Sequence, residues 1–178
     1  MTVERRYPDE PAGPFPEPPR SFTDREGRQI DLRELDHRDE SQLDTLVGMY
    51  ETFDPADRAQ GIPPVGEEKI IRWLDSVLAS SHDVVALHGD RIVGHATLVP
   101  DGEAAFELAI FVHQEYQQAG IGSRLLPALL GYGATAGVER VWLTVERWNH
   151  AAIALYKSVG FEVCTSESFE LEMALRLH

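Results

Sequence analysis

The most constraining feature of the sequence is an alternating apolar segment that leads into a glycine-containing turn and then into leucines at helical spacing. Along residues 104–112 the side chains alternate between two faces, Phe106, Leu108, Ile110 and Val112 against Glu107, Ala109 and Phe111. This alternation predicts a strand. After Gly120-Ile121-Gly122, the leucine spacing predicts a helix to about Gly137. The chain therefore contains a strand, a tight turn and a helix in direct succession.

Apolar periodicity predicts the other elements in the same way. Strands are expected around Ile30 and Leu32, and at Val84–Leu87, Ile92–Val99, Val141–Val145, Phe161–Thr165 and Phe169–Leu175. Helices are expected from Asp39 to near Phe53, from Glu67 to Ala79 and from Asn149 to Ser158. This order predicts an α/β (α+β) architecture, with helices packed on both faces of a mixed sheet.

Residues 1–28 differ from the rest of the chain in composition. Six prolines fall within the first 20 residues, where apolar periodicity is almost absent, so this stretch buries too little surface to offset its ordering. We predict an extended or disordered, flexible N-terminal arm over residues 1–28 and a single domain over residues 29–178. Residues 54–64 contain too many helix breakers for a helix and are predicted to be a loop.

Composition argues against several classes of partner. The 30 acidic residues outnumber the 16 basic ones, and the net charge of -14 would repel a nucleic-acid backbone. Only two basic residues are lysines, which is typical of acid-rich halophilic proteins, although a surface that attracts cationic amines is the alternative. No apolar run approaches the roughly 20 residues that span a bilayer, so we expect a cytoplasmic protein without a membrane partner.

Disulfide and metal chemistry are not expected either. Cys164 is the only cysteine, so no internal disulfide can form. The seven histidines show no metal-ligand spacing on a predicted helix.

The turn Gln117-Gln118-Ala119-Gly120-Ile121-Gly122 has the properties of an anion-binding segment. Its glycines bring the backbone close to a ligand, and the helix that follows offers unpaired N–H donors and the positive end of its dipole. Such a turn binds a diphosphate, although a simple strand-to-helix turn would show the same glycines. A dinucleotide-binding fingerprint does not fit, because Leu125 occupies its third glycine position, and the Walker sequence is absent.

A second constellation begins at Asn149, which is a good helix N-cap. Tyr156 follows about two turns later, roughly 10 Å along the same helix face. The two side chains can therefore reach one ligand. A structural cap followed by a core tyrosine is the alternative.

The two segments, separated by one predicted strand, resemble the GNAT acetyltransferase superfamily over about residues 29–178. In that family a Gln/Arg-x-x-Gly-x-Gly/Ala segment holds the pyrophosphate of coenzyme A, and an asparagine and a tyrosine lie on the next helix. The matching residues are Gln117, Gly120, Gly122, Asn149 and Tyr156, with Leu155-Tyr156 and Gly160-Phe161 at the usual helix end. The resemblance implies the GNAT fold, a central mixed, mostly antiparallel sheet of about seven strands with helices on both faces, and acetyl-CoA as cofactor.

The resemblance also implies cofactor-binding residues. Backbone N–H groups of Phe111 and Val112, at the splayed end of their strand, would polarise the thioester oxygen. Further cofactor contacts are expected from Gln117, Gln118, Ala119, Gly120, Ile121, Gly122, Ser123, Asn149 and Ala152.

Amide formation from a thioester needs a base and a proton for the departing thiolate. Tyr156 is the candidate general acid, because a phenol with a pKa of about 10 is close enough to a thiol with a pKa of about 8.5. Glu107 is the candidate general base, directly or through water, because similar protein acetyltransferases carry a catalytic glutamate there. Burial would have to raise its ordinary pKa of about 4.3, and an exposed strand carboxylate is the alternative.

The acceptor is expected to be a primary amine, of a small molecule or of a protein lysine or N-terminus, which attacks directly in a ternary complex. The loop 54–64 borders the acceptor entrance in this family, so Asp54 and Asp57 are candidate contacts for a cationic acceptor. The family commonly forms homodimers through its late strands. A noncatalytic acyl-CoA-binding sensor, which would need neither Tyr156 nor Glu107, is the alternative function.

Overall fold

The computed structural model describes residues 4–58, 61–166 and 169–177. Its strands are β1 (Arg20–Thr23), β2 (Gln29–Glu34), β3 (His82–His88), β4 (Arg91–Pro100), β5 (Phe106–Val112), β6 (Arg140–Glu146), β7 (Glu162–Ser166) and β8 (Glu170–Arg176). Its α-helices are α1 (Glu40–Glu51), α2 (Glu67–Leu78), α3 (Ile121–Thr135) and α4 (His150–Ser158), with short 3-10 helices η1 (Pro55–Asp57) and η2 (Gln114–Tyr116). The predicted loop 54–64 contains η1, and two of its residues, 59 and 60, lie outside the described ranges.

The described strands form one sheet in the order β1-β2-β3-β4-β5-β6-β8-β7. Neighbouring strands are antiparallel except β5 and β6, which run parallel. The predicted mixed, mostly antiparallel sheet is therefore confirmed, with eight strands in place of about seven. The additional strand is β1, which pairs with β2 and falls inside the segment 1–28 that the sequence assigns to the arm.

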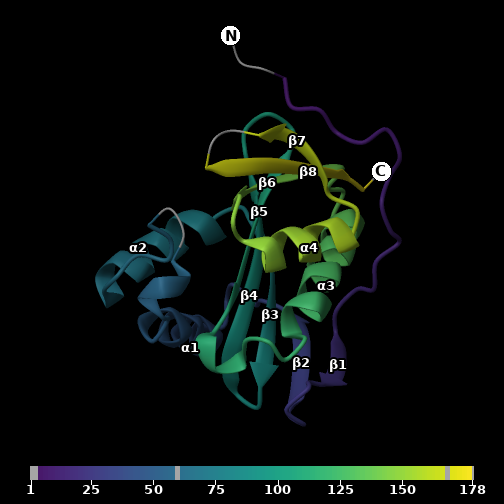
Figure 1. Cartoon of the computed structure of the whole chain (residues 1–178). Helices are drawn as coiled ribbons and strands as arrows, with labels where there is room; N and C mark the ends of the chain where they lie inside the picture. Colours follow the sequence, from purple (N-terminus) through teal and green to yellow (C-terminus); the bar gives the residue numbers. More distant parts are fainter. Residues whose placement is uncertain (1–3, 59–60, 167–168, 178) are drawn as a thin grey trace.

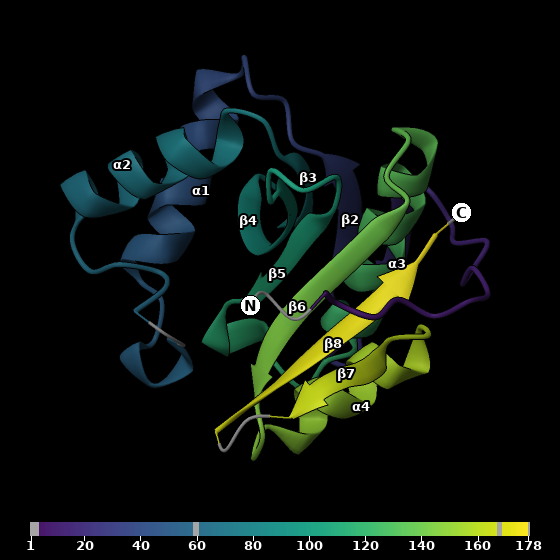
Figure 2. The same ribbon diagram turned by 90° about the horizontal axis from the view of Figure 1, so that it is seen from above.

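Helices cover both faces of this sheet, α3 and α4 on one face and α1 and α2 on the other (Figures 1 and 2). The core beneath α3 and α4 includes Leu108 of β5 and Leu125 of α3. The core beneath α1 and α2 includes Tyr50 and Leu74, and Phe111 of β5 packs against it. Alternate residues of β5 thus serve opposite cores, as its sequence predicts.

Strands β5 and β6 stay together for only two residue pairs, Phe106 with Val141 and Glu107 with Trp142. Beyond these pairs, β5 remains hydrogen-bonded to β4 and β6 to β8 along their full lengths. The sheet therefore opens between β5 and β6 toward their C-terminal ends. Alternate backbone N–H and C=O groups of a strand point to opposite edges, so both strands direct some of these groups into the opening.

From its N-terminal end, the segment before β1 runs over the face of β6 and β8 and then past α4 and α3 (Figures 1 and 2). The N–H of Ala12 donates to the backbone oxygen of Arg176 at 2.7 Å. In return, Nη1 of Arg176 donates to the backbone oxygen of Asp9 at 2.8 Å. The segment therefore contacts the sheet through its own backbone.

A buried polar network joins β3, β4 and α1. His95 Nε2 lies 2.7 Å from Asp83 Oδ1, and Nδ1 of the same ring lies 2.6 Å from the Tyr50 hydroxyl. His37 Nε2 lies 3.2 Å from the second Asp83 oxygen, to which the Ser81 hydroxyl also donates. Burial alone would raise the pKa of Asp83, but the hydrogen bonds and charge of His95, with the hydrogen bond of Ser81, lower the net pKa. Asp83 therefore stays ionised within the core.

We expect Asp83→Asn to lower the free energy of unfolding by roughly 2–3 kcal/mol at pH 7, because charge-assisted hydrogen bonds are lost in the core. The native pKa of Asp83 lies below the unfolded value of about 3.9. Its contribution is therefore complete above that pH and is lost as the pH falls through the lower native pKa. Urea unfolding at pH 7 and below pH 4 measures both effects.

His37→Ala is the control, because its side chain is 39% exposed and its contact with Asp83 should contribute less than about 1 kcal/mol. Equal free energies of unfolding for the wild type and Asp83→Asn at pH 7 would contradict the prediction.

Candidate functional site

A cavity of about 210 Å³ occupies the opening between β5 and β6. Its walls come from both diverging strands, from α4 and from the segment between α1 and α2. The lining residues are Asp57, Ile62, Glu107, Leu108, Ala109, Ile110, Phe111, Thr144, Val145, Glu146, Asn149 and Tyr156. Five predicted site residues meet here: Asp57, Glu107, Phe111, Asn149 and Tyr156. A larger hollow of about 620 Å³ lies beneath the N-terminal segment, but prolines, alanines and glycines supply much of its lining.

Helix α4 presents Asn149 and Tyr156 to this cavity. The Asn149 side chain caps the helix, as predicted, by accepting a hydrogen bond from the N–H of Ala152 at 3.2 Å. Tyr156 is only 9% exposed, and burial raises its pKa to about 12. Proton transfer from Tyr156 to a thiolate with an ordinary pKa of about 8.5 would therefore be uphill by roughly 5 kcal/mol. The expectation of a phenol with an ordinary pKa is therefore wrong, and burial favours the protonated form of the Tyr156 hydroxyl at neutral pH.

Glu107 lies at the last residue pair before the opening, opposite Trp142. Its side chain is exposed, but the protein around it still raises its pKa through partial burial. The charge of Arg5 lowers this pKa, and the charges of Asp101 and Glu172 raise it further. The net upward direction is the one that a general base requires, although solvent limits its size.

The turn before α3 adopts a conformation that glycine allows. Gln118 and Gly120 have φ angles of 59° and 87°, and α3 begins at Ile121. Because a glycine N-cap has no side chain, the N–H groups of the first helical turn remain available as donors. The Arg25 N–H donates to the backbone oxygen of Ala119 at 3.0 Å, and Arg25 Nε lies 3.7 Å from where a Cβ on Gly120 would be. The geometry and the positive charge fit an anionic diphosphate.

The remaining predicted cofactor residues lie in the first turns of two helices. A Cβ on Gly122 would lie 3.6 Å from Leu155, so the first turn of α3 contacts α4 closely. Ser123 is exposed in that same turn, and Ala152 is partly exposed in the first turn of α4. The start of α3 thus lies against the helix that carries Tyr156.

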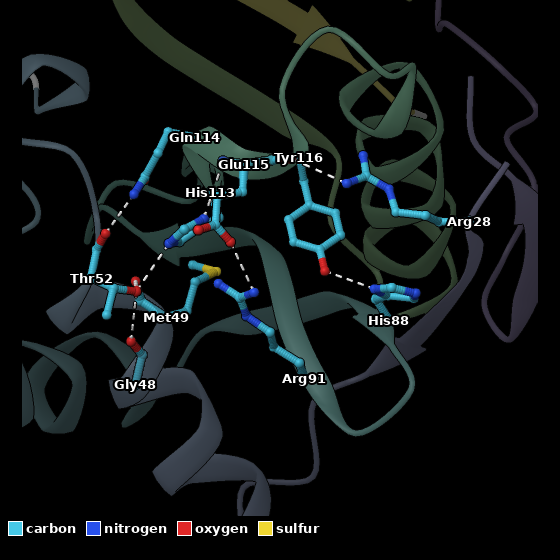
Figure 3. Close-up of polar contacts among 10 residues, drawn as sticks. All are labelled: Arg28, Gly48, Met49, Thr52, His88, Arg91, His113, Gln114, Glu115 and Tyr116. Carbon is cyan, nitrogen blue, oxygen red and sulfur yellow. Dashed lines mark hydrogen bonds and ion pairs between the residues drawn. The ribbon is translucent and has the colours of Figure 1, made fainter. Parts of the chain in front are cut away.

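Hydrogen bonds from two directions hold η2, which connects β5 to the glycine turn (Figure 3). On the α1 side, His113 Nε2 lies 2.9 Å from Thr52 Oγ1, and Gln114 Nε2 donates to the Thr52 backbone oxygen at 2.7 Å. On the side of the β3–β4 turn, the Tyr116 hydroxyl lies 2.7 Å from His88 Nδ1. These hydrogen bonds fix the position of η2, and therefore of the chain that enters the glycine turn.

Gln117 joins the glycine turn to the segment between α1 and α2. Its side-chain amide donates to Asp57 Oδ2 at 2.9 Å and to the Val112 backbone oxygen at 3.0 Å. Asp57 therefore faces the cavity. The Asp54 carboxylate instead caps η1 by accepting from the N–H of Ala56 at 2.9 Å, and Asp54 does not line the cavity. The structure thus separates the two aspartates predicted to contact an acceptor.

Several residues at this site are not predicted from the sequence. Arg25 falls within the segment assigned to the arm, and no local pattern links it to the glycine turn. Thr144 and Glu146 line the cavity from β6, and Ile62 lines it from the segment between α1 and α2. Alternation places Thr144 and Glu146 on one face of a strand but does not reveal that this face borders an opening.

Over residues 4–58, 61–166 and 169–177, no group of three or more histidine, cysteine, aspartate or glutamate residues is arranged to hold a metal ion. Within the same ranges, no helix is long and apolar enough to cross a bilayer.

The model of the acetyltransferase (GNAT) family matches residues 31–161 of this chain. The matched range includes β5, the glycine turn and α4, which together build the site.

This chain is also similar to individual N-acetyltransferases and to solved GNAT structures. The N-alpha-acetyltransferase RimI of Mycobacterium tuberculosis is 44% identical over 91 residues, which cover 48% of this chain and 56% of that protein. An uncharacterized N-acetyltransferase of the same organism is 29% identical over 121 residues, covering 61% of this chain and 78% of that protein. The solved GNAT domain of S. lividans PAT matches with a TM-score of 0.73 at 17% identity, covering 89% of this chain and 96% of that domain, and shows the shared fold.

Proposed function

The chain belongs to the acetyltransferase (GNAT) family, and on that premise we propose that it transfers an acetyl group from acetyl-CoA to a primary amine. The observation that carries this proposal is the cavity between β5 and β6, which Glu107 and Tyr156 line from different elements. The diphosphate-binding turn follows the same strand, β5. We propose that the reaction takes place in the cytoplasm, as expected for a sequence without an apolar run long enough to cross a bilayer.

The start of α3 suits the diphosphate of coenzyme A. Its first-turn N–H groups and helix dipole attract negative charge, and Arg25 supplies a cation beside Gly120. Gln117 would exchange its contact with Asp57 for the cofactor. Acetyl-CoA, when bound, supplies an activated acetyl thioester.

Three groups of this chain would carry out the three chemical tasks: polarising the carbonyl, removing a proton from the amine and stabilising the departing sulfur. The backbone N–H of Val112 would polarise a carbonyl oxygen held in the opening, whereas that of Phe111, like that of His113, points toward β4. The Glu107 carboxylate, directly or through water, takes a proton from the acceptor ammonium so that the free amine can attack. The Tyr156 hydroxyl donates a hydrogen bond to the departing sulfur, which stabilises its negative charge without a complete proton transfer.

We propose that the preferred acceptor is the N-terminal amine of a polypeptide and not a small-molecule amine. The name of the N-alpha-acetyltransferase relative supports this choice. Exposed apolar side chains also support it, because Ile62, which lines the cavity, is 37% exposed and Trp148, which precedes the cavity-lining Asn149 in the chain, is 59% exposed. Exposed apolar groups of this kind suit contacts with a peptide chain more than with a small charged amine.

Release of free thiol from acetyl-CoA, measured with a panel of peptide N-termini, lysine peptides and small amines, tests the proposed reaction. We expect release that depends on the acceptor and is fastest with a peptide N-terminus. Ser123→Asp should weaken coenzyme A binding at least tenfold, because it places a negative charge in the first turn of α3. Binding of acetyl-CoA without acceptor-dependent release on any amine would favour the sensor.

We expect Tyr156→Phe to lower kcat by at least about tenfold, because the departing sulfur loses its hydrogen-bond donor. The KM for acetyl-CoA should change less than about twofold, since the ring and its packing remain. Steady-state kinetics measure both constants. Tyr132→Phe, which removes a hydroxyl from the far half of α3, is the control. An unaltered kcat in Tyr156→Phe would remove the proposed role.

We expect Glu107→Gln to lower kcat/KM by roughly 10- to 100-fold near neutral pH. Because the pKa of Glu107 is raised, the wild-type kcat/KM should fall as the pH drops through that raised pKa, and the variant should lose this acid limb. The pH dependence of kcat/KM measures the effect, with the exposed Glu103→Gln as control. A Glu107→Gln variant with a normal pH profile would show that Glu107 is an ordinary strand carboxylate.

A further inference from the structure

The N-terminal arm brings a cation to the sheet face that carries Glu107. The guanidinium carbon of Arg5 lies 3.7 Å from the centre of the Trp142 ring. Trp142 is the strand partner of Glu107, and partners in a sheet project their side chains to the same face. The ring itself is held in place, because its Nε1–H donates to Asp101 Oδ2 at 2.9 Å.

Two carboxylates hold Arg5 there. Its guanidinium pairs with Glu172 of β8 and lies 3.8 Å from Asp101, which follows β4. The side chains are 20% exposed for Arg5, 24% for Glu172 and 12% for Asp101, so solvent screens their charges only in part. Arg5 favours the charged form of Glu107, whereas Asp101 and Glu172 disfavour it.

Among the residues that the structure describes, the other charged or titratable groups that line the cavity with Glu107 are not cations. Those that share its cavity are Asp57 of η1, Glu146 of β6 and Tyr156 of α4. Arg140 of β6 stacks on Tyr7 of the arm, with its guanidinium carbon 5.5 Å from the ring centre. Among the described groups that act on Glu107, Arg5 is the cation that offsets the surrounding carboxylates.

The position of Arg5 depends on close backbone packing of the arm. A Cβ on Gly131 of α3 would lie 2.7 Å from the backbone oxygen of Pro16 and 2.8 Å from that of Phe15. Backbone atoms cannot turn aside as a flexible side chain can, so any side chain at Gly131 would displace the arm. Together with the Ala12 contact to β8, this packing fixes the path of the N-terminal segment along α3 and β8 (Figure 1).

We propose that Arg5 is a positioning residue for acetyl transfer, delivered by the N-terminal arm so that Glu107 remains charged and able to take the proton from the acceptor. The inference rests on the proposed role of Glu107 as general base. In this inference, a residue of the N-terminal arm influences proton transfer, although the arm lies outside both the predicted domain 29–178 and the residues 31–161 that match the family.

Arg5→Gln in the full chain tests the proposal with two readouts, an NMR titration of the Glu107 carboxyl and the pH profile of kcat/KM. We expect the pKa of Glu107 and the acid limb to move up together by about 0.5 to 1 pH unit. That shift is a loss of roughly threefold to tenfold on the acid side, with no loss at high pH. Arg5→Lys should restore most of the activity. Arg6→Gln makes the same change of charge at an exposed neighbour and should move neither readout.

Gly131→Ala provides an independent variant, because it displaces the arm without changing any group near Glu107. We expect the same upward shift of both readouts as in Arg5→Gln. Gly48→Ala is the matched control, since Gly48 also lies in a helix but a Cβ there would meet nothing within 4 Å.

The outcomes separate this inference from the proposed function. An unchanged Glu107 titration in Arg5→Gln overturns the inference, whatever happens to the activity. A shifted titration with an unshifted acid limb shows that Glu107 is not the base, and the role of Arg5 in the reaction then falls with it. A joint shift in Arg5→Gln and Gly131→Ala, absent from Arg6→Gln and Gly48→Ala, supports the inference.

Discussion

Strands β5 and β6 are the parallel pair of an otherwise antiparallel sheet, and the site depends on how they are connected. A parallel pair cannot be joined by a tight turn, so the chain must cross from the end of β5 back to the start of β6. Helix α3 makes this crossing, and it therefore begins at the end of β5 where the two strands diverge. Helix α4 follows β6 from the same end. One topological requirement thus brings two helix N-termini to the opening.

The opening also connects the two faces of the sheet. Tyr156 belongs to the core beneath α3 and α4, whereas Phe111 packs with α1 and α2, yet both line the same cavity. A cofactor held by the start of α3 and an acceptor that enters beside η1 would meet from opposite sides. This arrangement favours direct attack within a ternary complex, because neither reactant has to leave before the other arrives.

The sequence predicts those parts of the site whose signals are local. A glycine turn after a strand, and Asn149 seven residues before Tyr156, are determined by neighbours in the chain, and the structure shows the turn and the cap as expected. Contacts between distant segments have no such signal. The arm lacks periodicity, so neither β1 nor the contact between Arg25 and Ala119 could be predicted. The raised pKa of Tyr156 depends on burial by other elements, which spacing along one helix does not report.

Salt affects the surface charge of this chain and the partly buried carboxylates near Glu107 differently. A net charge of -14 gives the surface a negative potential, which at physiological ionic strength is screened beyond about 8 Å. Asp101 and Glu172, whose charges act on Glu107, are only 12% and 24% exposed, so salt screens them less than it screens the surface charge. If Glu107 is the base, a nearby cation offsets these carboxylates and favours its charged form, whether the general acidity reflects a saline source or substrate attraction. The contact of Arg5 with Trp142 and Glu172 places a cation on the sheet face that carries Glu107, where the proposed base would need it.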